Sequence, residues 1–238
     1  MAHRGKRYEC LVQKVEEKAY EPAEAVALAK ELATAGFDET LELHLKTGLD
    51  PRHADQQVRS VVLLPHGLGK RVRIAVFAQG EGARLAGEAG ADVIGGDDLI
   101  QRIEGGWLDF DVTLATPEMM GRVGRLGRIL GPRGLMPNPR SGTVVNAEDL
   151  LRAIGEARKG RVEFRLDRTA CLHMPLGKAS FSPERLLDNL SAAIDAVNKA
   201  KPAGAKGHYL HTAYLKTTMS PSISLDLGAT LALAGRLS

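Results

Sequence analysis

Aromatic residues are scarce in this sequence, at 4% of 238 residues, and it has only two cysteines. A cofactor pocket walled by aromatic rings is therefore not expected. Cys10 and Cys171 form neither a C-x-x-C pair nor a disulfide framework, so we expect reduced thiols. The longest aliphatic run, residues 61–64, is far shorter than the roughly 20 residues that cross a bilayer, and no apolar run of a signal peptide follows the basic opening. These absences favour a cytoplasmic globular protein with no membrane partner.

Acidic residues are missing between Glu118 and Glu148, although the whole chain is nearly balanced, with 32 basic and 29 acidic groups. The net charge of +3 does not by itself indicate a nucleic-acid partner. The stretch instead interleaves glycines with arginines, namely Arg122, Arg125, Arg128, Arg133 and Arg140. Two interpretations remain open: a glycine-rich loop, stiffened by prolines, that packs on its own sheet, and a loop that contacts an RNA backbone.

The N-terminal part predicts a helix followed by a half-buried strand. Pro22 and the Ala- and Leu-rich residues 23–35 are typical of a helix that ends at Gly36. Strict alternation over residues 40–46 then predicts a strand. Leu41, Leu43 and Leu45 should face a core, which leaves Thr40, Glu42, His44 and Lys46 on the opposite, polar face.

The middle of the chain has a different texture, in which short apolar strands alternate with helical segments. We predict strands at 72–78, 92–94 and 111–115 and helices at 81–89, 97–104 and 146–158. This alternation is typical of a parallel sheet with helical crossovers, and it predicts a Rossmann-like module of three α/β layers.

After Gly160 the strand pattern returns, with strands predicted at 161–166 and 209–219 and a helix at 182–199. Residues 224–238 have no clear pattern, so we expect a loosely held tail. Because glycine-bearing joints bracket the middle module, we predict a discontinuous α+β domain, residues 1–67 and 160–238, with an inserted α/β domain, residues 68–159. Gly67, Gly69 and Gly160 would serve as hinges.

Motifs for catalysis or cofactor binding are incomplete. Gly80-Glu81-Gly82 follows a predicted strand, but Leu85 occupies the place of the third glycine of a dinucleotide site, and Glu81 would repel phosphates. The seven histidines show no metal-ligand spacing, and no nucleophile motif is present. We expect no enzyme activity, metal, cofactor or small-molecule substrate; the alternative is a middle domain that binds a nucleotide and runs a dehydrogenase-like reaction.

Several segments together resemble one protein family. They are FDET at 37–40, DPR at 50–52, LPHG at 64–67, ATPEMM at 115–120, LGRILGPRGLMPNP at 126–139, LGKASF at 176–181 and TTM at 217–219. In this order they resemble the bacterial large-subunit ribosomal protein L-one family, from about residue 5 to residue 223. The resemblance implies a discontinuous RNA-binding domain with an inserted Rossmann-like domain.

The resemblance also implies partners. Members of that family bind large-subunit rRNA in the mobile stalk near the E site, contact E-site tRNA transiently as deacylated tRNA leaves, and repress translation of their own operon mRNA. A regulator that acts only on messenger RNA is a further alternative.

Carried over by position, the family's RNA-binding surface falls on three strips of this sequence. They are Phe37, Thr40, Glu42 and His44; then His173, Gly177 and Lys178; and finally Thr217, Thr218, Met219 and Ser220. Short hydroxyl side chains and exposed amides suit folded RNA, which is recognised by shape, 2′-hydroxyls and phosphates. The alternatives are a solvated outer sheet face and, for Phe37, a core contact at the helix exit.

Two positions depart from the family pattern. Gly36 stands where a basic residue is usual, and Ser220 follows the TTM segment where glycine is usual. The first change removes a charge that would reach phosphate; Lys46, Lys178 or Lys216 could replace it. The second places a side chain where close approach to RNA, or a positive φ angle, would favour glycine.

Overall fold

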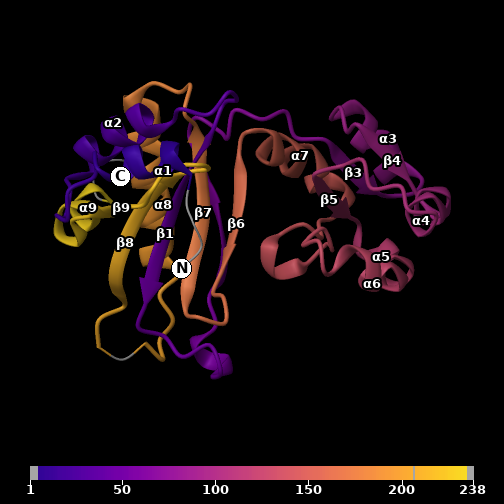
Figure 1. The fold of residues 1–238 in the computed structure, drawn as a ribbon. Helices are drawn as coiled ribbons and strands as arrows, with labels where there is room; N and C mark the ends of the chain where they lie inside the picture. The colour runs from indigo at the N-terminus through magenta and orange to yellow at the C-terminus, as the bar shows by residue number, and fades with distance from the viewer. Residues whose placement is uncertain (1–4, 206, 235–238) are drawn as a thin grey trace. The chain divides into compact units, whose positions relative to one another are not determined.

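The computed structural model describes residues 5–205 and 207–234. Contacts divide the chain into two compact units (Figure 1). One, the discontinuous unit, comprises the chain up to Gly69 and from Gly160 onward; the other, the inserted unit, is Lys70–Lys159. The fold is mixed, with antiparallel sheets in the discontinuous unit and a parallel sheet in the inserted unit, which confirms the predicted combination of sheet types.

The discontinuous unit contains a four-stranded antiparallel sheet in the order β7-β1-β8-β9 (Figure 1). Its strands are β1 (Thr40–Thr47), β7 (Cys171–Lys178), β8 (Leu210–Thr217) and β9 (Ile223–Leu225). A separate antiparallel pair is formed by β2 (Arg59–Leu63) and β6 (Arg161–Arg165). Helices α2 (Pro22–Leu32) and α8 (Pro183–Lys199) pack on one face of the larger sheet and share its apolar core.

Local sequence explains both packing helices. Pro22 occupies the first turn of α2, where its missing N–H has no intrahelical partner to lose. Ser182 caps α8 by accepting a hydrogen bond from the Arg185 amide, and the predicted stripe Leu186, Leu190, Ile194 and Val197 is fully buried. Burial of these stripes against the leucines of β1 holds the sheet on its helical layer.

Both ends of the described chain are ordered, and the prediction of a loose tail from residue 224 is wrong as far as residue 234. Strand β9 pairs with β8, and Asp226 caps helix α9 (Leu227–Leu233) by accepting from the Ala229 amide. Helix α1 (Lys6–Val12) was not predicted. Tyr20 closes the outer edge of β9, because its N–H donates to Ser224 O over 2.9 Å and its carbonyl accepts from the Asp226 amide over 2.8 Å.

In the inserted unit a parallel sheet has helices on both faces. Strand β3 (Ile74–Phe77) lies between β4 (Val93–Gly95) and β5 (Val112–Ala115). Alternate β3 residues enter two different apolar clusters, one on each face of the sheet. The first cluster includes residues of helices α3 (Glu81–Glu88) and α7 (Leu150–Arg158). The second includes residues of helices α4 (Asp97–Glu104), α5 (Pro117–Val123) and α6 (Gly127–Leu130). The predicted strands and helices of this unit are therefore present, with the helix expected at 146 starting as a 3-10 turn, Ala147–Asp149.

The arginine- and glycine-rich stretch is not a loop as far as Leu130, which corrects that prediction. Helices α5 and α6, joined by a 3-10 turn over Gly124–Leu126, occupy residues 117–130. The apolar residues Met119, Val123, Leu126 and Leu130 recur at helical spacing and are buried. Their burial outweighs the low helix propensity of the interleaved glycines. Arg122, Arg125 and Arg128 are exposed, and Arg122 is paired with Asp97 at 2.7 Å.

Within the discontinuous unit, the segment where the chain leaves for residues 70–159 touches the segment where the chain returns. Gly67, Gly69 and Gly160 have φ angles of 67°, 70° and 103°. A Cβ on Gly160 would lie 2.4 Å from the Gly67 Cα, so only glycine fits there. The fully buried Asn189 holds the first crossing: its amide accepts from the His66 N–H and donates to the carbonyl oxygens of Gly67 and Leu176.

Candidate functional site

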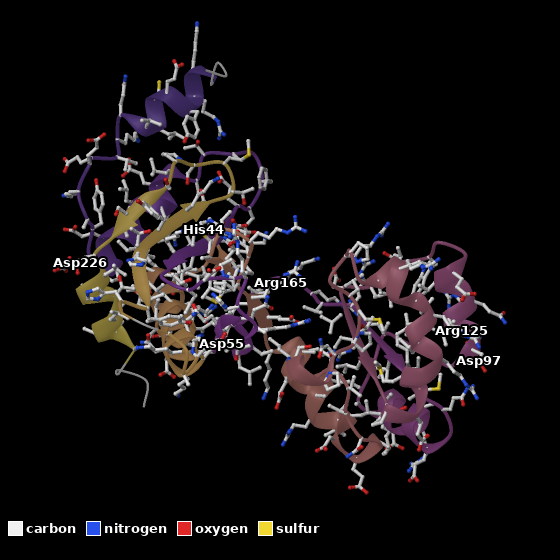
Figure 2. The ribbon with its side chains drawn as sticks, turned by 90° about the horizontal axis from the view of Figure 1, so that it is seen from below. His44, Asp55, Asp97, Arg125, Arg165 and Asp226 are labelled. Carbon is white, nitrogen blue, oxygen red and sulfur yellow. The ribbon has the colours of Figure 1, made fainter. Side chains whose placement is uncertain are left out.

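The larger sheet of the discontinuous unit has one buried and one polar face. Leu41, Leu43 and Leu45 are at most 1% exposed, which confirms the predicted alternation of β1. On the opposite face, register places His44, which is labelled in Figure 2, between His173 on β7 and Tyr214 on β8. It places Glu42 between Pro175 and Lys216. The sheet therefore brings the first two predicted strips together.

A buried carboxylate ties the third strip to the first. Glu39 is 1% exposed; its Oε1 accepts from the Ala35 amide at 2.9 Å, and its Oε2 accepts from Thr217 Oγ1 at 2.7 Å and from the Met219 amide at 2.8 Å. Burial alone would raise the pKa of Glu39, but these hydrogen bonds, with a smaller contribution from Arg7, hold the pKa below its ordinary value. The ionised group thus fixes the chain after α2 to the turn after β8.

Each of the two segments joined by Glu39 exposes one apolar side chain. Phe37 is 55% exposed and Met219 is 46% exposed. The alternative that Phe37 is a core contact is therefore wrong. Arg7 adds a further tie, since its guanidinium donates to Met219 O at 3.4 Å and to Thr34 Oγ1 at 3.2 Å. Two apolar groups are thus held in solvent on segments that are internally fixed.

Thr40, Lys178 and Thr218 form one hydrogen-bonded group. The Thr40 N–H donates to Thr218 Oγ1 at 3.0 Å, and Lys178 Nζ donates to Thr40 Oγ1 at 3.0 Å and to Asp38 O at 3.1 Å. Asp38 in turn accepts from the amide and hydroxyl of Ser180. Residues from all three predicted strips therefore meet at this end of the sheet.

Three of the predicted residues point inward. Thr217 and Ser220 are at most 1% exposed, and Ser220 Oγ accepts from the Thr217 amide at 3.0 Å and donates to Pro221 O at 3.0 Å. Among the residues described, Ala170 alone has a positive φ without being glycine, so Ser220 does not need the backbone freedom of glycine. A Cβ on Gly177 would meet Phe181 at 3.0 Å and Leu186 at 3.2 Å, which makes this glycine a packing requirement. These three residues therefore support the surface from within.

Two histidines face each other across β1 and β7. Their Nδ1 atoms are 2.7 Å apart, while His44 Nε2 lies 3.5 Å from Glu42 Oε2 and His173 Nε2 lies 3.5 Å from Asp167 Oδ2. Burial, followed by the charges of His173 and Lys216, lowers the pKa of His44, and Glu42 opposes this effect. Hydrogen bonds from the Cys171 amide, Thr169 and His173 outweigh burial and hold the pKa of Asp167 at about 2.

Glu39 and Asp38 are the functional positions that the sequence interpretation missed. Glu39 immediately precedes the alternating run, and extending the alternation back by one residue gives it the parity of the buried Leu41, Leu43 and Leu45. A carboxylate at a core-facing position must find donors, and that requirement is a signal of its role. Asp38 carries no comparable signal, because the same extension gives it the parity of the polar face, where a carboxylate is ordinary.

The inserted unit has a cavity of about 520 Å³ beside the ends of β3 and β5. It is lined by Gln79, Gly80, Glu81, Gly82, Thr116, Pro117, Glu118, Asn146 and Ala147. Two carboxylates and no basic side chain among these residues make it a poor place for phosphates, so the nucleotide-binding alternative gains no support. Over the described residues, no group of three or more His, Cys, Asp or Glu side chains could hold a metal ion, and no helix is long and apolar enough to span a membrane.

Comparison with known proteins gives consistent matches. The model of the ribosomal protein L1p/L10e family matches residues 29–221. The chain is 57% identical to the large ribosomal subunit protein uL1 of Dehalococcoides mccartyi over 236 residues, which cover 99% of this chain and 100% of that protein. It is 54% identical to the proteins of the same name from Chloroflexus aggregans, over 96% of this chain and 98% of that one, and Chloroflexus aurantiacus, over 95% and 96%. The matched region contains every predicted site residue from Phe37 to Ser220.

Proposed function

Because the chain belongs to the ribosomal protein L1p/L10e family, we propose that it is a structural constituent of the large ribosomal subunit that binds large-subunit rRNA and catalyses no reaction. It acts in the cytoplasm, on the ribosome, and needs no cofactor. The discontinuous domain, residues 1–67 and 160–238, binds the RNA, and Gly67, Gly69 and Gly160 serve as hinges to the inserted domain, residues 68–159.

The proposed RNA face consists of the surface groups of the three strips. They are Phe37, Thr40, Glu42, His44, His173, Lys178, Thr218 and Met219. Lys178 on β7 and Lys216 on β8, on either side of β1, supply cations for phosphates. Glu42 would accept a hydrogen bond from a 2′-hydroxyl or a base amine, and Phe37 would stack on an unpaired base. Gly177, Thr217 and Ser220 support this surface from within.

One observation carries the proposal: Phe37 and Met219 are exposed on segments that Glu39 fixes by three hydrogen bonds. Exposed apolar side chains on a mobile loop would lose conformational freedom when they bind. Here that freedom is already restricted by the buried carboxylate, so contact with a base or ribose retains more of its favourable free energy. A solvated outer sheet face does not require such preorganisation.

The finer functions rest on the family resemblance. We propose that the RNA target lies in the mobile stalk near the E site, that the protein contacts E-site tRNA as deacylated tRNA leaves, and that it represses translation of its own operon mRNA. If purified large subunits lack the protein while it binds the messenger tightly, the alternative of a messenger-only regulator is favoured instead.

The test is the double variant Phe37→Ala/Met219→Ala, with affinity for a stalk rRNA fragment measured by filter binding. Loss of a stacked ring and an apolar contact should weaken binding by about 1–3 kcal/mol, which is roughly five- to 150-fold. Leu151→Ala removes an equally exposed apolar side chain from the inserted unit, at 61% exposure, and should leave affinity unchanged. Equal affinity of the double variant and the wild type would contradict the proposed surface.

A further inference from the structure

The two paired histidines lie at the end of the RNA face away from Thr40 and Lys178, in a row of four ionisable groups. Glu42, His44, His173 and Asp167 follow one another, with 3.5 Å between each carboxylate and the nearest ring and 2.7 Å between the two Nδ1 atoms. The rings meet edge to face, with centroids 5.0 Å apart. Each ring therefore directs one nitrogen at the other ring and one nitrogen at a carboxylate.

Counting ring protons shows which charge state this row accommodates. A contact of 2.7 Å between two Nδ1 atoms requires one proton between them, because two lone pairs or two N–H groups would repel. Each Nε2 faces a carboxylate and is favoured as an N–H. The arrangement in which every ring nitrogen has a suitable partner thus has three N–H protons on two rings, which is one more than two neutral imidazoles carry. A neutral pair leaves one lone pair facing a carboxylate, and a doubly protonated pair brings two N–H groups together.

The charges around the pair make that single proton decisive. Two carboxylates and two lysines surround it: Glu42 and Lys46 on β1, Asp167 just before β7, and Lys216 opposite Glu42 on β8. The neighbouring titratable groups without charge are Tyr214, opposite His44, and Cys171, opposite Lys46. With a neutral pair, the two lysines and two carboxylates balance. One added proton gives this part of the RNA face a net positive charge, which attracts an RNA phosphate.

We propose that His44 and His173 act together as one proton-sharing cation that binds an RNA phosphate, so that RNA binding is coupled to the uptake of one proton. This inference rests on the proposed function and adds a ligand group and a pH dependence to it. A bound phosphate stabilises the charged pair, and protonation in turn strengthens phosphate binding, because the two equilibria are linked.

The coupling to RNA is tested by measuring affinity for the stalk rRNA fragment between pH 5.5 and pH 8, at fixed ionic strength. Wild-type affinity should fall as pH rises, by at most about tenfold per pH unit for one proton. His44→Gln and His173→Gln, which keep polar side chains without the charge, should bind more weakly than the wild type, and their affinity should depend less steeply on pH. His66→Gln is the matched control, because His66 pairs with Asp188 on α8, behind the buried face of the sheet.

The proton itself is tested without RNA, by imidazole nitrogen spectra of the full-length protein. Between the two titration steps of a coupled pair, we expect a state with one added proton shared by the two Nδ1 atoms. Independent titration of the two rings would overturn the inference, and so would a wild-type pH profile equal to that of His173→Gln. Failure of the wild type to bind the fragment at any pH is a different result, because it would remove the proposed function as well.

Discussion

At the scale of single residues, Glu39 connects stability with the RNA face. Replacement by Gln keeps the volume but puts an NH2 group opposite the Ala35 amide or opposite the Thr217 hydroxyl and Met219 amide. One or more buried donors then lose their acceptor, so Glu39→Gln should lower the free energy of unfolding by about 1–3 kcal/mol. Urea denaturation measures this change. Glu31→Gln, which removes only an exposed ion pair with Lys14, should change stability by less than about 1 kcal/mol.

The stabilising effect of Glu39 should also depend on pH in the acid range. The pKa of Glu39 is lower in the folded protein than its ordinary value of 4.5. Its ionisation therefore stabilises the fold fully above that ordinary value, and the contribution is lost as pH falls through the lowered pKa. The stability difference between wild type and Glu39→Gln should narrow below pH 4.5. A constant difference across this range would show that ionisation of Glu39 is unimportant.

At the scale of elements, the crossing of Gly67 and Gly160 gives a sharp contrast between two glycines. Gly160→Ala combines a positive φ of 103° with a Cβ placed 2.4 Å from the Gly67 Cα, so it should destabilise the protein by more than about 1 kcal/mol. Gly155 lies inside α7, with no neighbouring atom within 4 Å of an added Cβ. Gly155→Ala should therefore stabilise by roughly 0.5–1 kcal/mol. The unfolding temperatures of both variants, measured against the wild type, test this contrast. Equal shifts would show that the close contact of Gly160 with Gly67 does not require glycine.

Elements that repeat their periodicity several times could be predicted, and the short elements near the two chain ends could not. The β1 strand has four alternating pairs and α8 has four turns of apolar stripe, so each repeats its signal several times. Strand β9, with three residues, and helices α1 and α9, with seven each, are too short for a periodicity. Their conformation depends on partners distant in sequence, such as Tyr20 for β9. In α5 and α6 the glycines concealed a helical apolar spacing.

At the scale of the whole molecule, the apolar cores do not share residues between the units. The buried cluster of the discontinuous unit contains no residue of Lys70–Lys159, and the two clusters of the inserted unit contain no residue outside it. Gly67 and Gly160 are in contact, so a short glycine linker can replace residues 68–159. The shortened protein should unfold cooperatively and lose less than about 1.4 kcal/mol of RNA-binding free energy. Calorimetry and filter binding measure the two quantities, and a larger loss would show that the inserted unit contacts the RNA.

The candidate site shows which relations a sequence contains and which arise only on folding. Parity along β1 predicted that Glu42 and His44 share a face, and only an extension of that parity to residue 39 would have put Glu39 inside. The contact between His44 and His173 depends on the register of β1 against β7, which includes a bulge between Leu41 and Glu42. No local pattern specifies that register. The support of Met219 by Glu39 likewise joins positions 180 residues apart.

The short strand β9 also affects how copies of the protein behave toward each other. It covers Ala213, Tyr214 and Leu215 of β8, whose backbone groups would otherwise be free to pair with a strand from another molecule. Tyr20 then covers β9 with two backbone hydrogen bonds. Residues that have no regular pattern in the sequence thus protect this side of the sheet against intermolecular β-pairing, the first step of aggregation.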